Sequence, residues 1–274
     1  MKNILPEKNR KYRSIWISDL HLGFKGCNVN YFLDFLHANE CEQLYLLGDI
    51  IDLWSMQRSM YWPQSHNNVI RTILGKAKHG TKVIYIPGNH DIQFREYHGL
   101  SFGNLTIKEE DVHVTADGKR LLLLHGDIFD SAMKCNRFTS FIGNIGYDFL
   151  LYINRHFHSL RSKFKFSYWS LSSFIKARVK NAMKHIQHYE NIVAAEAKRR
   201  GVDGVICGHI HHAELREINN ILYCNTGDWV EHCTALVEHH DGRLELIHWS
   251  DKHHGLKEQL ADPEKELAAI KTAA

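Results

Sequence analysis

Five short apolar runs of this chain each stop at a glycine or another small residue, and aspartate, asparagine or histidine follows at once. These junctions cover residues 17–21, 46–52, 84–91, 123–127 and 206–211. Such apolar, β-branched runs are typical of buried strands, and open α/β sheets bind their ligands at the carboxyl ends of the strands. One junction indicates little, but five in one chain predict a polar site where several strand ends meet.

The spacing of apolar residues in the first third of the chain predicts alternating strands and helices. We expect strands at 14–18, 44–47 and 82–86, and helices at 29–39 and 67–79. The order β-α-β-α-β implies parallel strands joined by right-handed crossovers, which is typical of the α/β class. Further short strands are expected at 112–115, 120–124, 204–207, 221–224, 234–238 and 243–249.

Residues 129–200 break this order, because they have helical spacing and no strand pattern. Helices are expected at 138–155, 170–185 and 186–200. Between Lys134 and Lys184, ten lysines and arginines stand against one acidic residue, Asp148, and aromatic residues lie among them. The segment from about 130 to 200 therefore predicts a helical cap insertion over the strand ends with an anion-facing surface, although a solvated basic face is the simpler alternative. Four of its cations are expected to bind a phosphate-containing, lipid-linked substrate: Arg155, Arg161, Lys163 and Lys165.

The chain has 274 residues and ordinary globular composition, with 44% hydrophobic residues. It is predicted to form one domain over 1–252, with the cap inserted, and a polar tail at 253–274. The formal charge of only +3 argues against nucleic acid as the partner. Six cysteines without a C-x-x-C pair favour a reducing, cytoplasmic compartment. Because no signal region and no run of the ~20 apolar residues of a membrane span is found, we expect at most peripheral contact with the inner membrane.

Seven side chains at the junctions are donors that bind divalent metal ions: Asp19, His21, Asp49, Asn89, His125, His209 and His211. Alternate residues of an extended segment point the same way, so each pair of donors two residues apart can reach one ion. The pairs are Asp19 with His21 and His209 with His211. Mixed imidazole and carboxylate donors suit Mn, Fe, Zn or Co, and seven donors are too many for one tetrahedral zinc. Two ions bridged by one carboxylate would use all seven, and such pairs hydrolyse phosphate esters.

Together, the motifs D-x-H, G-D-x-x-D, G-N-H-D, H-G-D and G-H-x-H resemble those of the calcineurin-like metallophosphoesterase superfamily. The resemblance implies a four-layer α-β-β-α sandwich of two mixed sheets. It also implies two divalent ions, for which we expect manganese, with iron, zinc or cobalt as alternatives. Asp19, His21 and His211 would hold one ion, Asn89, His125 and His209 the other, and Asp49 would bridge them.

The same resemblance assigns roles around these ligands. His90 would protonate the leaving oxygen or stabilise its charge, and Asp52 would orient His90 and raise its pKa. Asp91 and Asp127 are expected to support the ligands or to shape turns.

Within the superfamily the chain is most similar to the bacterial UDP-2,3-diacylglucosamine pyrophosphatases of lipid A synthesis, which also insert helices between H-G-D and G-H-x-H. This resemblance implies cleavage of a pyrophosphate or phosphodiester bond in a nucleotide-linked lipid or sugar. Two positions differ, since His90 stands where those enzymes have arginine and Asp130 stands alone where they have an acidic pair. A nuclease or general phosphodiesterase is therefore the alternative enzyme. A non-catalytic binding module is disfavoured, because every metal position and His90 are present.

Overall fold

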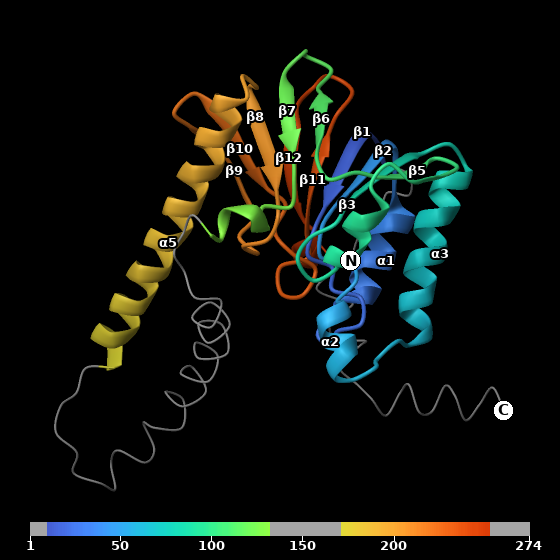
Figure 1. Cartoon of the computed structure of the whole chain (residues 1–274), viewed down its shortest axis with the longest axis horizontal. Helices are drawn as coiled ribbons and strands as arrows, with labels where there is room; N and C mark the ends of the chain where they lie inside the picture. Colours follow the sequence, from blue (N-terminus) through green and yellow to red (C-terminus); the bar gives the residue numbers. More distant parts are fainter. Residues whose placement is uncertain (1–9, 132–170, 253–274) are drawn as a thin grey trace, which may run out of the picture.

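The computed structural model describes residues 10–131 and 171–252 of the protein (Figure 1). The predicted helix at 138–155, most of the predicted cap and the tail at 253–274 lie outside these residues. The four cationic residues expected to bind substrate also lie outside them: Arg155, Arg161, Lys163 and Lys165.

The larger of two sheets has seven strands in the order β12-β11-β1-β2-β3-β5-β4. Its strands are β1 (Arg10–Ile17), β2 (Asn39–Leu47), β3 (Lys82–Ile86), β4 (Ser101–Phe102), β5 (Leu105–Ile107), β11 (Thr234–Glu238) and β12 (Leu244–His248). β1, β2, β3 and β5 are parallel, as the β-α-β-α-β pattern predicted, whereas β4, β11 and β12 are antiparallel to their neighbours. The carboxyl ends of the parallel strands therefore share one edge.

The smaller sheet has five strands in the order β6-β7-β8-β10-β9. They are β6 (Asp111–Val114), β7 (Arg120–Leu123), β8 (Gly204–Cys207), β9 (Glu214–Ile218) and β10 (Ile221–Asn225). β7, β8 and β10 are parallel, and β6 and β9 pair antiparallel at the two edges. Both sheets are thus mixed, as expected.

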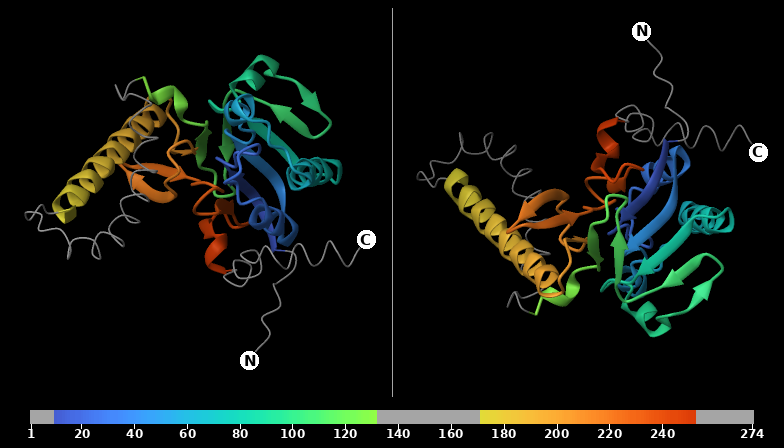
Figure 2. Two further views of the ribbon diagram at one scale, coloured as in Figure 1. Left: turned by 90° about the horizontal axis from the view of Figure 1, so that it is seen from below. Right: turned by 90° about the horizontal axis from the view of Figure 1, so that it is seen from above.

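Helices cover the outer face of each sheet, as the views in Figure 2 show. The helices are α1 (Val29–Ala38), α2 (Leu53–Arg58), α3 (Gln64–Lys78), α5 (Leu171–Arg199) and α6 (Trp249–Lys252), with 3-10 turns η1 (Ile92–Tyr97) and η2 (Asp127–Phe129). α1 and α3 lie against the larger sheet and α5 against the smaller one, so the predicted four-layer α-β-β-α order is confirmed. The predicted break between two helices at 185–186 is wrong: α5 is continuous, because no glycine or proline interrupts it.

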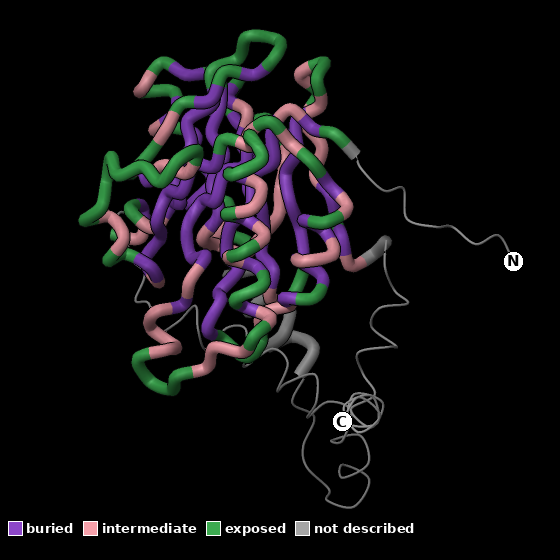
Figure 3. Tube along the Cα trace, turned by 90° about the vertical axis from the view of Figure 1, so that its right-hand side faces the viewer, coloured by how far each residue is buried: buried purple, intermediate pink, exposed green. Residues whose placement is uncertain are grey.

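Three apolar layers hold the sandwich together, and the residues of the central strands are mostly buried (Figure 3). In β1, Trp16 lies between the sheets, while Ile15 and Ile17 face the helices. In β7, Leu123 lies between the sheets and Leu122 faces α5. Strands buried on both sides consist of nearly continuous apolar residues, which explains why the junctions begin with apolar runs. Within the described ranges, no helix combines the length and the apolar character needed to span a bilayer.

Candidate metal centre

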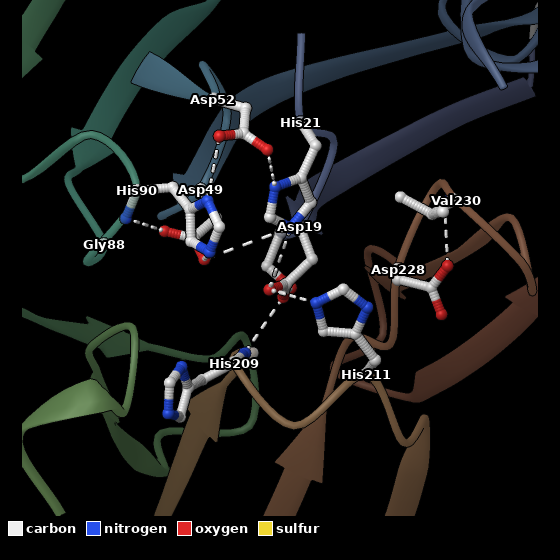
Figure 4. Close-up of polar contacts among 12 residues, drawn as sticks. Asp19, His21, Asp49, Asp52, Gly88, His90, His209, His211, Asp228 and Val230 are labelled. Carbon is white, nitrogen blue, oxygen red and sulfur yellow. Dashed lines mark hydrogen bonds and ion pairs between the residues drawn. The ribbon is translucent and has the colours of Figure 1, made fainter. Parts of the chain in front are cut away.

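The polar side chains that follow the parallel strands of both sheets converge at one edge of the sandwich (Figure 4). Asp19 and His21 follow β1, Asp49 follows β2, Asn89 and His90 follow β3, His125 follows β7, and His209 and His211 follow β8. The structure therefore brings together all seven donors that the sequence singles out. Each sheet contributes part of the set, so the site depends on how the two sheets face each other.

The backbone of the site adopts an uncommon conformation at five of these donors. Their φ angles are left-handed: 52° at Asp19, 55° at His21, 53° at Asp49, 73° at His209 and 54° at His211. A non-glycine residue in this region costs about 1–3 kcal/mol. Backbone hydrogen bonds hold the strained turns, including Asp19 N to Gly48 O at 3.1 Å and His21 N to Asp49 O at 2.9 Å. Strain of this kind, gathered in one place, is typical of functional sites.

One group of donors consists of Asp19, His21 and His211, whose donor atoms all lie within 4.8 Å of one another. His21 Nε2 is 4.0 Å and His211 Nε2 is 3.1 Å from Asp19 Oδ1. His209 does not join this group, although its spacing from His211 would allow both to reach one ion. The φ angles at both histidines are left-handed rather than extended.

A second group consists of Asp49, His125 and His209, again with all donor atoms within 4.8 Å. His125 Nε2 is 3.4 Å from Asp49 Oδ2 and 3.3 Å from Asn89 Oδ1, which places the amide oxygen of Asn89 beside this group. Asp49 also forms a group with His21 and His90. The Asp49 carboxylate thus lies between the two groups, where a bridging ligand would have to be.

The polar atoms of the site fit a bound cation. His21 Nε2 and Asp19 Oδ1 are buried and make no hydrogen bond. An unsatisfied buried polar atom costs about 1–3 kcal/mol, and coordination to a cation would satisfy both atoms. Glycine lets the loops approach closely enough, because a Cβ at Gly88 would collide with the side chains of Asp49 and His125. Carboxylate, imidazole and amide donors in this arrangement suit a divalent transition metal.

The carboxylates and imidazoles shift one another's pKa. Burial raises the pKa of Asp49, but His125 and other imidazoles lower it well below its usual range. Burial lowers the pKa of His125, but the Asp49 carboxylate raises it to about 10. Burial likewise lowers the pKa of His211, but the Asp19 carboxylate raises it to about 9. Both histidines therefore hold protons at pH 7, and a metal ion must displace those protons to bind the ring nitrogens.

His90 lies at the rim of the site and is held by Asp52. Its Nδ1 is 3.0 Å from Asp52 Oδ1, and the other oxygen, Oδ2, is 3.2 Å from His21 Nδ1. Asp52 also caps α2 by accepting from the Ser55 amide at 2.8 Å. Burial lowers the pKa of His90, but the hydrogen bond to Asp52 and nearby carboxylates raise it overall. The ring of Trp54 contacts His90 with a centroid distance of 4.3 Å and an angle of 34° between the ring planes.

Asp91, which directly follows His90, lies beneath the loops and is fully buried. Its carboxylate accepts from the amides of Gly88 at 2.6 Å and Ile50 at 2.8 Å, and from the Tyr85 hydroxyl at 2.5 Å. This carboxylate joins the loops that carry Asp49 and Asn89, so it shapes the site without facing the donor groups.

Sequence reasoning missed several residues that shape the site. Asp228 is fully buried, follows β10, and accepts from the Val230 amide at 2.8 Å. The stretch 225–228, Asn-Thr-Gly-Asp, repeats the strand-end pattern and could have been found from it. No sequence pattern indicates a role for Trp54, because only the folded structure brings it next to His90.

A further group of potential donors, Glu190, His212 and Glu214, lies outside the two groups described above. Glu190 is buried on α5 and already forms an ion pair with Arg216 of β9. The contact therefore joins α5 to the edge of the smaller sheet.

The chain is similar in sequence to a known family and to several named proteins. The family model described as calcineurin-like phosphoesterase matches residues 12–213. A protein named UDP-2,3-diacylglucosamine hydrolase from Edwardsiella ictaluri is 27% identical over 229 residues, which cover 80% of this chain and 85% of the relative. A protein of the same name from Azotobacter vinelandii is 26% identical over 214 residues, or 75% of this chain and 84% of the relative. The solved structure of an archaeal phosphodiesterase is 13% identical, with a TM-score of 0.40 over 85% of this chain and 98% of that one.

Proposed function

The chain belongs to the calcineurin-like phosphoesterase family and is a hydrolase of phosphoester bonds, and from this premise we propose that it cleaves the pyrophosphate or phosphodiester bond of a nucleotide-linked lipid or sugar. The observation that carries the reaction type is the Asp49 carboxylate, which lies between two groups of metal donors. The substrate class is supported by the relatives named UDP-2,3-diacylglucosamine hydrolase.

The ligand assignment that we propose follows the two groups. Asp19, His21 and His211 would hold one ion, Asn89, His125 and His209 would hold the other, and Asp49 would contribute to both. When bound, a pair of divalent cations supplies Lewis acidity toward the phosphoryl group and lowers the pKa of a water molecule. Manganese is the proposed metal, with iron, zinc or cobalt as alternatives, because the donors mix imidazole with oxygen.

His90 is the proposed general acid. Its Nδ1 faces Asp52, so Nε2 is left toward the site, 4.0 Å from Asp49 Oδ2. Because the pKa of His90 is raised, the ring is charged over a wider pH range and can donate the Nε2 proton to the leaving oxygen. Asp52 keeps the ring in this orientation, and its pKa stays below the usual range because the hydrogen bonds of His21 and His90 outweigh the effect of burial.

The experiment that tests this function compares substrates on the manganese-loaded protein. Hydrolysis of a chromogenic phosphodiester is expected, and UDP-2,3-diacylglucosamine is expected to be cleaved and to inhibit that hydrolysis competitively. Inhibition by single-stranded DNA without inhibition by the lipid would instead favour the nuclease. Absence of hydrolysis with manganese, iron, zinc and cobalt would leave only a binding module.

We also propose a cytoplasmic location with peripheral contact at the inner membrane surface. The support is the excess of cations between Lys134 and Lys184, since basic aromatic segments bind anionic lipid. Co-sedimentation with anionic vesicles, but not with neutral ones, is the expected result. Equal recovery with both vesicle types would contradict this contact.

A further inference from the structure

A short turn directly after His125, residues 126–130, makes side-chain contacts to the surroundings of the second donor group. It consists of Gly126, the 3-10 turn η2 and Asp130. We call it the 126–130 turn. Its two carboxylates, those of Asp127 and Asp130, contact different parts of the site.

Asp130 contacts His209 directly. Its Oδ1 lies 2.8 Å from His209 Nε2, and the Asp130 side chain is 35% exposed at the rim. A neutral histidine that donates through Nε2 has an unprotonated Nδ1, which is free to coordinate a metal. Histidine ligands are commonly oriented by such a carboxylate on their other nitrogen. The contact therefore sets both the tautomer and the ring orientation of His209.

Asp127 is connected through the side chain of Arg95 to the loop that carries Asn89. Its Oδ1 accepts from Arg95 Nη2 at 2.7 Å. The same guanidinium donates to the carbonyl oxygen of Pro87, from Nη2 at 3.0 Å and from Nε at 3.2 Å. Pro87 lies two residues before Asn89, so the turn also fixes the loop that presents this amide.

The first donor group has different supports. The carboxylate of Asp19 accepts from the Ser18 hydroxyl and from the His209 amide, and Nδ1 of His21 faces Asp52. His211 Nε2 faces Asp19 itself. These contacts come from residues next to β1, β2 and β8 rather than from the 126–130 turn.

From this difference we propose that the 126–130 turn controls the affinity of the second metal position selectively, with Asp130 as the positioning residue for His209. The inference rests on the proposed function, because it takes Asn89, His125 and His209 as ligands of one ion. His125 precedes the turn in the chain, Asp130 holds His209, and Asp127 holds the Asn89 loop through Arg95. One five-residue segment therefore directly follows one ligand of this ion, holds a second through Asp130 and holds the loop of a third through Arg95.

The test is a manganese titration of Asp130→Ala and Asp130→Asn by calorimetry and electron paramagnetic resonance. Asp130→Ala is expected to weaken one of the two binding events by about 10–100-fold and to leave the other unchanged. At limiting manganese, the spectrum of coupled ions should give way to that of an isolated ion. Asp130→Asn should lose less affinity, because its amide oxygen can still accept from Nε2–H.

A matched control is Asp117→Ala, which removes a carboxylate from an exposed turn where it pairs with Lys119. It should bind both ions as the wild type does. Equal weakening of both ions by Asp130→Ala, or no weakening of either, would overturn the inference.

His209→Ala separates this inference from the proposed function. If His209→Ala still binds both ions with full affinity, the ligand assignment itself is wrong and the inference falls with it. If His209→Ala loses one ion while Asp130→Ala binds both normally, the assignment stands and only the role of the turn is refuted. Thermal unfolding of each variant before metal addition verifies that the fold is retained.

Discussion

Two buried clusters of this molecule both join carboxylates to histidines, and they differ in whether their polar atoms are satisfied. In the network between the sheets, Glu238 accepts from Arg13 at 2.7 Å, from His113 Nε2 at 2.8 Å and from the Ala116 amide at 2.7 Å. The other ring nitrogen of His113 is 3.0 Å from the Tyr45 hydroxyl. Every polar group of this network therefore has a protein partner, as buried polar groups require for stability.

In the metal centre, by contrast, not every buried polar atom has a hydrogen-bond partner in the protein. His21 Nε2 has no hydrogen bond, Asp19 Oδ1 has only the ion pairs with His211 and His21, and the backbone at Asp19 and His21 is left-handed. Residue type alone therefore does not separate a structural cluster from a ligand site. What separates them is a buried donor atom, His21 Nε2, that has no hydrogen-bond partner and that a bound cation would satisfy.

The largest effect is expected from Asp49→Asn, because the Asp49 carboxylate is shared by the donor groups. Turnover on a chromogenic phosphodiester with manganese is expected to fall by roughly 1000-fold, because several kcal/mol of metal-based stabilisation are lost and ~1.4 kcal/mol corresponds to a factor of ten. Metal content should fall as well. Glu238→Gln is the control and should keep the wild-type turnover. If Asp49→Asn worked within tenfold of the wild type, the centre would not be catalytic.

His90→Ala tests whether a histidine of the site acts in proton transfer rather than as a metal ligand. We expect both metals to be retained and turnover to fall by about 100-fold or more, because a general acid contributes at least that factor. His37→Ala, an exposed histidine on α1, should have no effect. Full turnover at full metal content would refute the role of His90, whereas loss of a metal would make His90 a ligand.

Glu238→Gln tests the satisfied network through stability. The free energy of unfolding is expected to fall by about 2 kcal/mol at pH 7, because a charged, hydrogen-bonded carboxylate is removed. Burial raises the pKa of Glu238, but His113, Ala116 and Arg13 lower it to about 2, below the usual 4.5. The stabilisation is therefore complete above about pH 4.5 and is lost as the pH falls toward 2.

Urea unfolding from pH 7 to pH 3 measures this effect. The difference between the wild type and Glu238→Gln should narrow as the pH falls. Glu42→Gln, an exposed carboxylate beside His240, is the matched control and should change little. A constant difference across the range would show that the charge of Glu238 does not matter.

The smallest expected effect is proton release on metal binding. The raised pKa values of His125 and His211, about 10 and about 9, mean that both rings are protonated at pH 7. Manganese binding should then release about two protons, as ligand histidines must be neutral. Calorimetry in buffers of different ionisation enthalpy measures the number. Release should decline as the pH rises through 9 and 10, and no release at pH 7 would show that both rings are already neutral before the metal binds.

The strands were predicted best where both faces are buried. The bounds of β3, β8 and β11 agree with the expected ranges, because continuous apolar runs mark strands inside a sandwich. The first half of β2, with the sequence NECEQ, was missed. Its polar residues have no strand signature, and pairing with β1 in the folded sheet makes this stretch a strand. β9 is polar too, and its pairing with β10 places it at a sheet edge.

The sequence by itself determined which donors exist and that they stand at strand ends, because buried runs and the residues after them are local patterns. The tertiary structure alone decided which donors face each other. His209 and His211 are two residues apart and lie in different groups, whereas Asp19 and His21, with the same spacing and the same left-handed φ, share one. Likewise, Trp54 and Asp130 gained their places beside His90 and His209 only through the packing of separate elements. Contacts between distant segments depend on how the two sheets meet, and no local pattern encodes that.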